Sequence, residues 1–266
     1  MKNKFLILFF ALSIFAISCR KERRDTLGSS ISTDNNTAEN LFSDMFKVVD
    51  DVSMNTAGIR EDIIGCIDTI IVDTTSNPKT VLIDFGTNEC TGNDGRVRKG
   101  ILHITYTGRY REAGTVITIT PENYSVNDNL IEGQKTIENL GLNNNGQLHY
   151  SIAVSGTVTA PGNAWTISWT ANRIRTWLEG QNTASVWDDV YEISGNGSGV
   201  NRNGVPYTTT ITQALRAEIG CPWLVSGKFT IQPEDYATRF IDFGDGACDS
   251  GFTVTVNGQE YQLGSD

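Results

Sequence analysis

The amino-acid sequence predicts a mainly β protein, an antiparallel meander or sandwich of hairpins with one N-terminal helix. Apolar and polar residues alternate over short stretches from about residue 67 onward, which is the pattern of strands with one buried face. Asn-Gly pairs at 145–146, 203–204 and 257–258 separate such stretches, and this dipeptide favours two-residue hairpin turns. A helical period of apolar residues runs from about 38 to 52.

The first eighteen residues predict a bacterial lipoprotein signal peptide. Lys2 and Lys4 precede an apolar run over 5–17, and Ser18 stands just before Cys19. The apolar run is too short to span a bilayer as a helix. We therefore expect residues 1–18 to be removed and Cys19 to carry the lipid anchor. The alternative is an ordinary secretory signal in which Cys19 is present by chance.

Residues 19–37 are expected to form the lipidated cysteine and a flexible tether to the body. The segment 20–24 is basic, which suits anionic lipid headgroups, although a solvated charge run explains it equally well. From residue 25 to 36 the chain is almost entirely polar. The β-rich body is then expected to occupy residues 38–266.

The helix expected at 38–52 places Leu41, Met45, Val48 and Val52 on one side, so its expected role is to cover part of a sheet. Two further short helices are expected, at about 57–63 and 213–218.

The body contains an internal repeat, at about 57–96 and 213–254. Each copy contains Ile-Gly-Cys, then Ile-Asp-Phe-Gly, then a second cysteine. The cysteines are Cys66 and Cys90 in the first copy, and Cys221 and Cys248 in the second. The repeat favours two disulfides, each within one copy, and export permits their oxidation. Free thiols and a thiolate metal site are the alternatives, and zinc is disfavoured because there is no Cys-x-x-Cys motif.

Four segments carry the clearest strand alternation, and hydroxyl side chains form the polar face in each. In one of them Trp165, Ile167 and Trp169 fall on one face. The four segments are 101–107, 115–120, 165–170 and 207–212.

Two acidic loops follow the Ile-Asp-Phe-Gly blocks. Carboxylates interleaved with glycine can supply oxygen ligands to calcium, and the alternative is a tight turn in which Asp bonds the backbone and Gly adopts positive φ. The candidate calcium ligands are Asp84, Asp94, Asp242, Asp245 and Asp249.

Arg173, Arg175 and Trp177 alternate along one expected strand and form a candidate ligand surface for a carboxylated glycan. The alternative is core tryptophan with arginines that pair with surface acids. Asp188 and Asp189 are adjacent carboxylates, and with Glu179 they are the candidate acids for glycosidic chemistry. Adjacent strand residues point to opposite faces, which favours a solvated strand entry over a catalytic pair.

The net charge of −10 argues against a nucleic-acid partner, because that binding depends on neutralising phosphates. No Gly-x-Ser-x-Gly or His-Glu-x-x-His motif is present, so the sequence indicates no catalytic residues, resident metal or cofactor.

The signal segment, the polar tether, the repeated Ile-Asp-Phe-Gly blocks with their cysteines and the Asn-Gly hairpins resemble uncharacterised lipoproteins of the Bacteroidota. The resemblance implies lipid anchoring in the cell envelope, on the outer membrane, and brings no known activity. We expect a non-catalytic envelope protein that binds a glycan or an envelope protein, or that serves a structural role. The alternative is a carbohydrate-active enzyme of the envelope.

Overall fold

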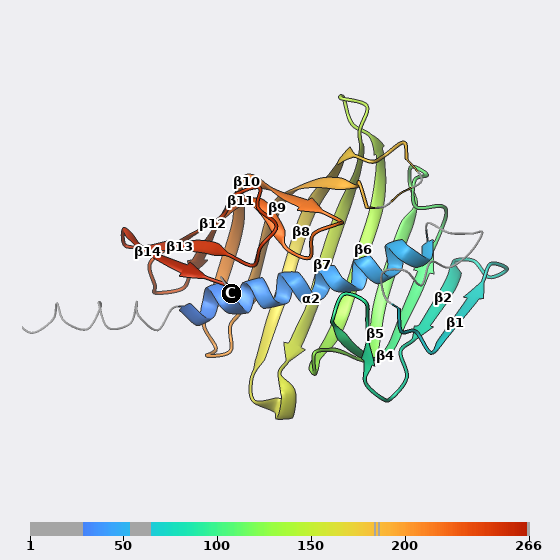
Figure 1. Cartoon of the computed structure of the whole chain (residues 1–266), viewed down its shortest axis with the longest axis horizontal. Coiled ribbons are helices and arrows are strands. Elements are labelled where there is room, and N and C mark those ends of the chain that lie inside the picture. Colours follow the sequence, from blue (N-terminus) through green and yellow to red (C-terminus); the bar gives the residue numbers. More distant parts are fainter. Residues whose placement is uncertain (1–28, 54–64, 184, 186, 265–266) are drawn as a thin grey trace, which may run out of the picture.

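The computed structural model describes residues 29–53, 65–183, 185 and 187–264 of the 266-residue chain. The expected signal segment, Cys19, the start of the expected tether and the expected helix at 57–63 lie outside the described residues. The body is an antiparallel sheet that curves strongly around one helix, α2 (Ser29–Ser53) (Figure 1). The expected fold class, mainly β with one N-terminal helix, is confirmed.

The sheet has 14 strands, and its strand order follows the chain from β1 to β14, with β3 paired to β4 outside this order. This sequential order identifies the fold as a meander. The strands are β1 (Thr69–Asp73), β2 (Lys79–Asp84), β3 (Cys90–Thr91), β4 (Val97–Tyr106), β5 (Val116–Val126), β6 (Asn129–Leu142), β7 (Leu148–Thr159), β8 (Thr166–Glu179), β9 (Val190–Val200), β10 (Pro206–Glu218), β11 (Leu224–Pro233), β12 (Arg239–Asp245), β13 (Phe252–Val256) and β14 (Gln259–Leu263).

The turn chemistry of the sequence sets the connections. The three Asn-Gly pairs expected as turns lie between consecutive paired strands, whereas a fourth, Asn196-Gly197, lies inside β9. At the last of them, Asn257 and Gly258 both have positive φ, 51° and 79°, and they join Val256 to its cross-strand partner Gln259. Positive φ at both central residues matches the right-handed twist of the flanking strands.

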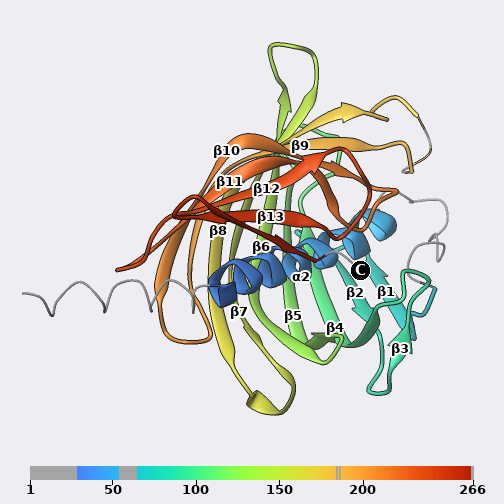
Figure 2. The same ribbon diagram turned by 60° about the vertical axis from the view of Figure 1, so that its left-hand side comes forward.

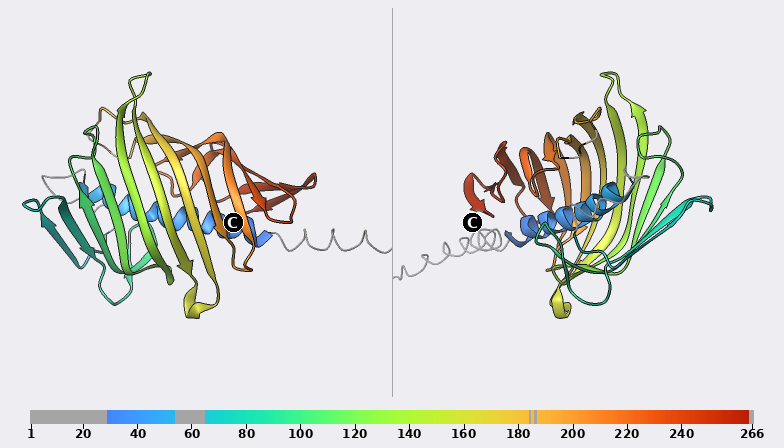
Figure 3. Two further views of the ribbon diagram at one scale, coloured as in Figure 1. Left: turned by 180° about the vertical axis from the view of Figure 1, so that it is seen from behind. Right: turned by 45° about the vertical axis from the view of Figure 1, so that its right-hand side comes forward.

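Helix α2 lies along the concave face of the sheet, against β6, β7 and β8 (Figure 2). Seen from behind, the sheet hides most of the helix (Figure 3). The expected apolar face is confirmed where side chains are described, because Leu41, Met45 and Val48 are buried. The core is the layer between this face and the inward side chains of the strands.

The helix begins nine residues earlier than the sequence predicts, so the expectation of a tether to residue 37 is wrong for residues 29–37. Ile31 and the polar side chains of Ser32, Asp34 and Asn35 are buried there. Asp34 accepts hydrogen bonds from the backbone and the side chain of Arg202, and Asn35 Oδ1 accepts one from Trp169 Nε1 at 3.0 Å. Partners in distant strands therefore order a segment that its composition alone identifies as a tether.

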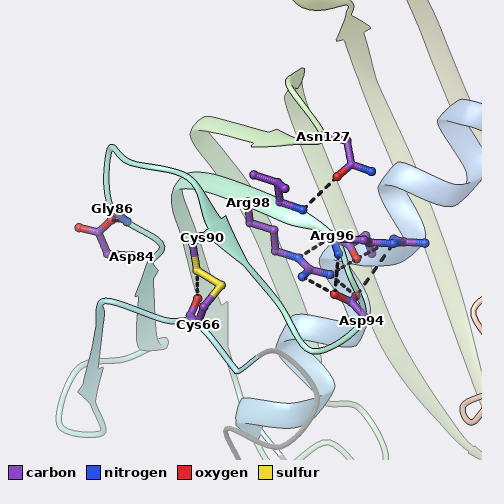
Figure 4. The surroundings of a disulfide bond; sticks show 10 residues. Cys66, Asp84, Gly86, Cys90, Asp94, Arg96, Arg98 and Asn127 are labelled. Carbon is purple, nitrogen blue, oxygen red and sulfur yellow. Dashed lines mark hydrogen bonds and ion pairs between the residues drawn. A yellow bond between two sulfur atoms is a disulfide. The ribbon is translucent and has the colours of Figure 1, made fainter.

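Among the described side chains of α2, the carboxylate of Asp44 accepts hydrogen bonds from three different residues. It is fully buried and accepts from Arg98 Nη2 at 2.6 Å, Arg96 Nη1 at 2.7 Å and Tyr124 Oη at 3.0 Å. Burial, with the charge of Asp44, raises the pKa of the Tyr124 hydroxyl well above its usual value, so this group stays a donor. Asp94 also binds Arg98 (Figure 4). The buried guanidinium of Arg98 therefore bonds two carboxylates, those of Asp44 and Asp94.

The two copies of the internal repeat form the same local structure. In each, a disulfide closes a hairpin: Cys66–Cys90 encloses β1 and β2, and Cys221–Cys248 encloses β11 and β12. The Ile-Asp-Phe-Gly block begins in the second strand of each hairpin, and it lies wholly within the strand only in β12. The expected cysteine pairing is confirmed. The two closed hairpins lie near opposite ends of the sheet (Figure 1).

The helix expected at 213–218 is wrong, because these residues belong to β10. Register shifts interrupt the pairing of β10 between Thr210 and Leu215 on one side and between Ile211 and Ala217 on the other. A bulged strand bends and does not keep strict alternation, which is why the segment lacks a clear period of two.

Replacing Asp44 by Asn should lower the free energy of unfolding by about 3–5 kcal/mol, because it removes the carboxylate that compensates buried Arg98. Urea unfolding followed by circular dichroism measures this. The control is Glu138→Gln on the exposed face of β6, expected to change stability by no more than about 0.5 kcal/mol. Equal effects of the two substitutions would contradict the role given to Asp44.

Replacing Cys221 and Cys248 together by Ser should lower the free energy of unfolding by about 3.5 kcal/mol through the entropy of the unfolded chain. The bridged residues are separated by 27 positions here and by 24 in the other pair, so the matched Cys66 and Cys90 double variant should lose nearly the same amount. Urea midpoints under oxidising conditions test this. A double variant as stable as the parent would contradict it.

Candidate functional site

A cavity of about 90 Å³ lies between α2 and the inner face of the sheet from β6 to the end of β10. We call it the inner chamber. Three of its lining side chains are cationic, one is acidic and most of the others are apolar or aromatic. They are Glu39, Phe42, Ser43, Lys135, Ile152, Val154, Trp169, Ala171, Arg173, Arg175, Tyr191, Ile193, Ala217 and Ile219.

Strand alternation in β8 sends Arg173 and Arg175 into this chamber. They share one strand face with Trp177, as the sequence predicts, but that face is the buried one. The exposed fractions are 6%, 5% and 0%, so these side chains form no solvent-exposed surface and agree with the alternative of a core tryptophan beside paired arginines. A period of two shows which side chains share a face, and it cannot show which face the helix covers.

Strand β9 places glycines at 195, 197 and 199 on the inner face, and none of the three lines the chamber. A Cβ atom at Gly199 would lie 2.6 Å from Tyr207 Oη, and one at Gly197 would lie 3.0 Å from Thr209 Oγ1. The glycines therefore allow side chains of β10 to approach β9 closely at the curved part of the sheet.

Arg173 is the least satisfied of the cations in the chamber. Its Nη2 donates to Glu39 Oε2 at 2.9 Å, and its guanidinium carbon lies 5.9 Å from the centre of the Trp169 ring. Its Nε and Nη1 atoms have no hydrogen-bond partner among the described residues. A buried donor without a partner costs about 1–3 kcal/mol of folding free energy, so an acceptor that bound these donors would stabilise the folded protein.

Arg175 lies among tyrosine rings. Its guanidinium carbon is 4.4 Å from the centre of the Tyr191 ring and 5.3 Å from that of Tyr150, and Nη2 donates to the hydroxyl of Tyr110. Cation–π contacts of this kind stabilise a desolvated guanidinium.

Lys135 completes the positive charge of the chamber. Its Nζ donates to the backbone carbonyl of Phe42 at 2.8 Å. Burial, with the positive charge of Arg175, lowers the pKa of the Lys135 ammonium group to about 7. The side chains that line the chamber thus place up to three positive charges beside the single carboxylate of Glu39.

Sequence reasoning missed Lys135 and Glu39, although one signal for Lys135 was present. Lys135 occupies an inward position between Ile131 and Ile137 on β6, where strand alternation expects an apolar residue. Glu39 carried no such signal, because polar residues on the side of an amphipathic helix away from its apolar face are expected to contact solvent.

The candidate calcium acids do not converge in the structure. Asp84 and Asp242 each bond the backbone two residues on, at Gly86 (2.7 Å) and Gly244 (2.9 Å), which is the turn alternative. The remaining acids are separate: Asp94 binds Arg98, Asp249 accepts from the Gly251 N–H group, and Asp245 is exposed at the end of β12. Within the described ranges, no three His, Cys, Asp or Glu side chains group as metal ligands.

The candidate acids for glycosidic chemistry also have separate environments. Glu179 pairs with Arg216 Nη2 at 3.0 Å, and Asp188 accepts from Thr183 Oγ1 at 3.0 Å. Asp189 is fully buried and accepts from Tyr191 Oη at 3.3 Å.

A larger depression of about 620 Å³ lies over β8 to β11 and differs in character from the inner chamber. Exposed Thr170, Thr208 and Gln232 contribute to its lining, and Glu234 is the one charged residue among those that line it. A hydroxyl-lined surface is the ordinary solvated face of an antiparallel sheet. Its lining includes one buried hydroxyl without a hydrogen-bond partner among the described residues, that of Tyr207, whereas the inner chamber contains two such donors on the buried charged group of Arg173. The inner chamber is therefore the stronger candidate site.

Comparison with known proteins found no match to a family model, to a curated protein or to a solved structure. Across the described residues, no helix has both the length and the apolar content to cross a bilayer. The assignment of the candidate site therefore rests on the contacts and burial of this chain's own residues.

Asp189→Asn should stabilise the protein at pH 8 and have little effect near pH 4. Burial raises the pKa of the Asp189 carboxyl to about 6, above the value of about 3.9 for an unfolded chain. The folded state therefore binds this proton more tightly, and the stability it contributes is lost as the pH rises through 6. Asn keeps an acceptor and does not ionise.

Urea unfolding at pH 4, 6 and 8 measures this, with Asp188→Asn as the exposed neighbouring control. A change in stability that is independent of pH would contradict the assignment.

Proposed function

We propose that this chain is a lipid-anchored protein of the bacterial cell envelope that binds a small ligand in its inner chamber and does not catalyse a reaction. The observation that carries the binding role is Arg173, a buried guanidinium with two donor atoms that have no partner among the described residues. Proteins seldom bury such a group unless something satisfies it.

The proposed anchor rests on the first nineteen residues. A basic start, a short apolar run and Ser18-Cys19 support lipidation of Cys19 and, with the resemblance to Bacteroidota lipoproteins, a place on the outer membrane. Two disulfides suit the oxidising compartments beyond the cytoplasmic membrane. Because α2 begins at Ser29, about ten residues would link the lipid to the helix that covers the chamber.

The sequence analysis expects a ligand on the surface of the sheet, whereas we propose that the ligand binds in the inner chamber. A small, partly open cavity of this size suits a small molecule or one end of a longer one, whereas a glycan chain or an envelope protein needs a larger open surface. The catalytic alternative has less support, because Glu179, Asp188 and Asp189 are bonded to different partners.

Cys19→Ser should abolish lipid labelling and release the protein from the membrane fraction, because a chain without the acyl groups loses its hydrophobic attachment. Growth with an alkyne fatty acid followed by fractionation measures both effects. Cys66 and Cys90 replaced together by Ser provide the matched control and should remain labelled. Continued labelling of Cys19→Ser would remove the proposed anchor.

Ligand binding is tested by thermal unfolding of the chain from residue 19 to 266, carrying Cys19→Ser, against small organic acids, amines, alcohols and monosaccharides. At least one class should raise Tm, because a ligand that binds only the folded state stabilises it. Ala171→Leu fills the chamber and should remove the shift, whereas Ala153→Leu on the outer face should retain it. No shift with any class, or a shift that survives Ala171→Leu, would contradict binding in the chamber.

A further inference from the structure

We propose that the inner chamber takes the carboxylate of an apolar organic acid, which binds Arg173 in place of the Glu39 side chain. The inference rests on the proposed function, since it names the ligand class for the same chamber.

The first step is charge. Lys135, Arg173 and Arg175 all line the chamber, and Glu39 is the acidic side chain that lines it with them. A second anion is therefore attracted, and a neutral or cationic group is not. Nε and Nη1 of Arg173 have no hydrogen-bond partner among the described residues. Nε shares one edge of the planar guanidinium with Nη2, the atom that donates to Glu39, so a carboxylate that replaces Glu39 can bind Nε and Nη2 with its two oxygens.

The second step is size. An apolar cavity of about 150 Å³ holds a benzene ring, so a chamber of 90 Å³ holds about four non-hydrogen atoms. A carboxylate and the carbon attached to it have that size. The rest of a longer ligand must extend outside the chamber.

The third step is the chemistry of the solvent-accessible part of the lining. Among the lining residues Ser43 is exposed, and Ile193, Ala217 and Ile219 are partly exposed. Ile193 and Ile219 also pack against the core at its edge. Three apolar side chains at the edge of a cationic chamber suit a ligand with an acidic end and an apolar remainder.

The fourth step is the internal carboxylate. Glu39 Oε2 contacts Arg173 Nη2 at 2.9 Å, and the Glu39 side chain is 15% exposed while that of Arg173 is 5% exposed. Glu39 lies on α2 at the boundary with solvent, so it can turn outward when another carboxylate binds. Glu39 thus occupies part of the site and competes with the ligand.

Titration calorimetry tests the proposal with octanoate and octanamide, which are nearly equal in shape and differ in charge. The protein is the chain from residue 19 to 266 with Cys19→Ser. Octanoate should bind at least about tenfold more tightly than octanamide, because hydrogen bonds to charged groups contribute more than 1.4 kcal/mol. Inorganic phosphate should bind more weakly than octanoate, because it has no apolar part.

Two substitutions complete the test. Glu39→Gln removes the internal competitor and should tighten octanoate binding, whereas Glu138→Gln on the outer face should leave it unchanged. Arg173→Gln should abolish the preference for octanoate over octanamide. If Arg173→Gln fails to fold, the effect of Glu39→Gln and the comparison of octanoate with octanamide still test whether the chamber binds a carboxylate.

Equal binding of octanoate and octanamide would overturn the carboxylate assignment and leave the proposed chamber in place. Weaker octanoate binding by Glu39→Gln, or phosphate binding as tight as that of octanoate, would also overturn it. If neither octanoate nor octanamide binds while another class raises Tm through the chamber, the ligand class is wrong and the binding role stands. If no class binds, both proposals fall.

Discussion

The structure depends on the match between acidic side chains of α2 and cationic side chains on the inner face of the curved sheet. Asp44 faces Arg98 and Glu39 faces Arg173, and the cations are nearly inaccessible to solvent. Neither partner is stable in that position alone, because an unpaired buried charge costs several kcal/mol. The helix and the sheet therefore stabilise each other, because each supplies the counter-charges for buried groups of the other.

The inner chamber is the place where this match is incomplete. The two buried aspartates described on α2 are bonded by arginines, Asp34 by Arg202 and Asp44 by Arg96 and Arg98. At the chamber the helix supplies only Glu39 against the charges of β6 and β8. Apolar side chains line the chamber beside these charges and give it an amphipathic character. The candidate site is thus a consequence of how the helix is held.

Disulfide bonds, rather than ion pairs with α2, stabilise the hairpins near the two ends of the sheet. An open sheet exposes two edges, which are prone to fraying and to pairing with other chains. The repeated unit places a disulfide-closed hairpin near each end, with an Asp-bonded glycine turn after each Ile-Asp-Phe-Gly strand. Each disulfide lowers the conformational entropy of its hairpin in the unfolded chain. The chamber lies between these two hairpins, against β6 to β10.

The sequence by itself determined the features that depend on near neighbours: strand alternation, the Asn-Gly turns and the pairing of cysteines inside each repeat. It did not determine that α2 begins at Ser29, or that Arg173 and Arg175 point inward. The partners that order the helix lie far along the chain, with Arg98 54 positions from Asp44 and Arg202 168 positions from Asp34. Only the tertiary structure brings them together, because the burial of a charge is decided by what packs over it.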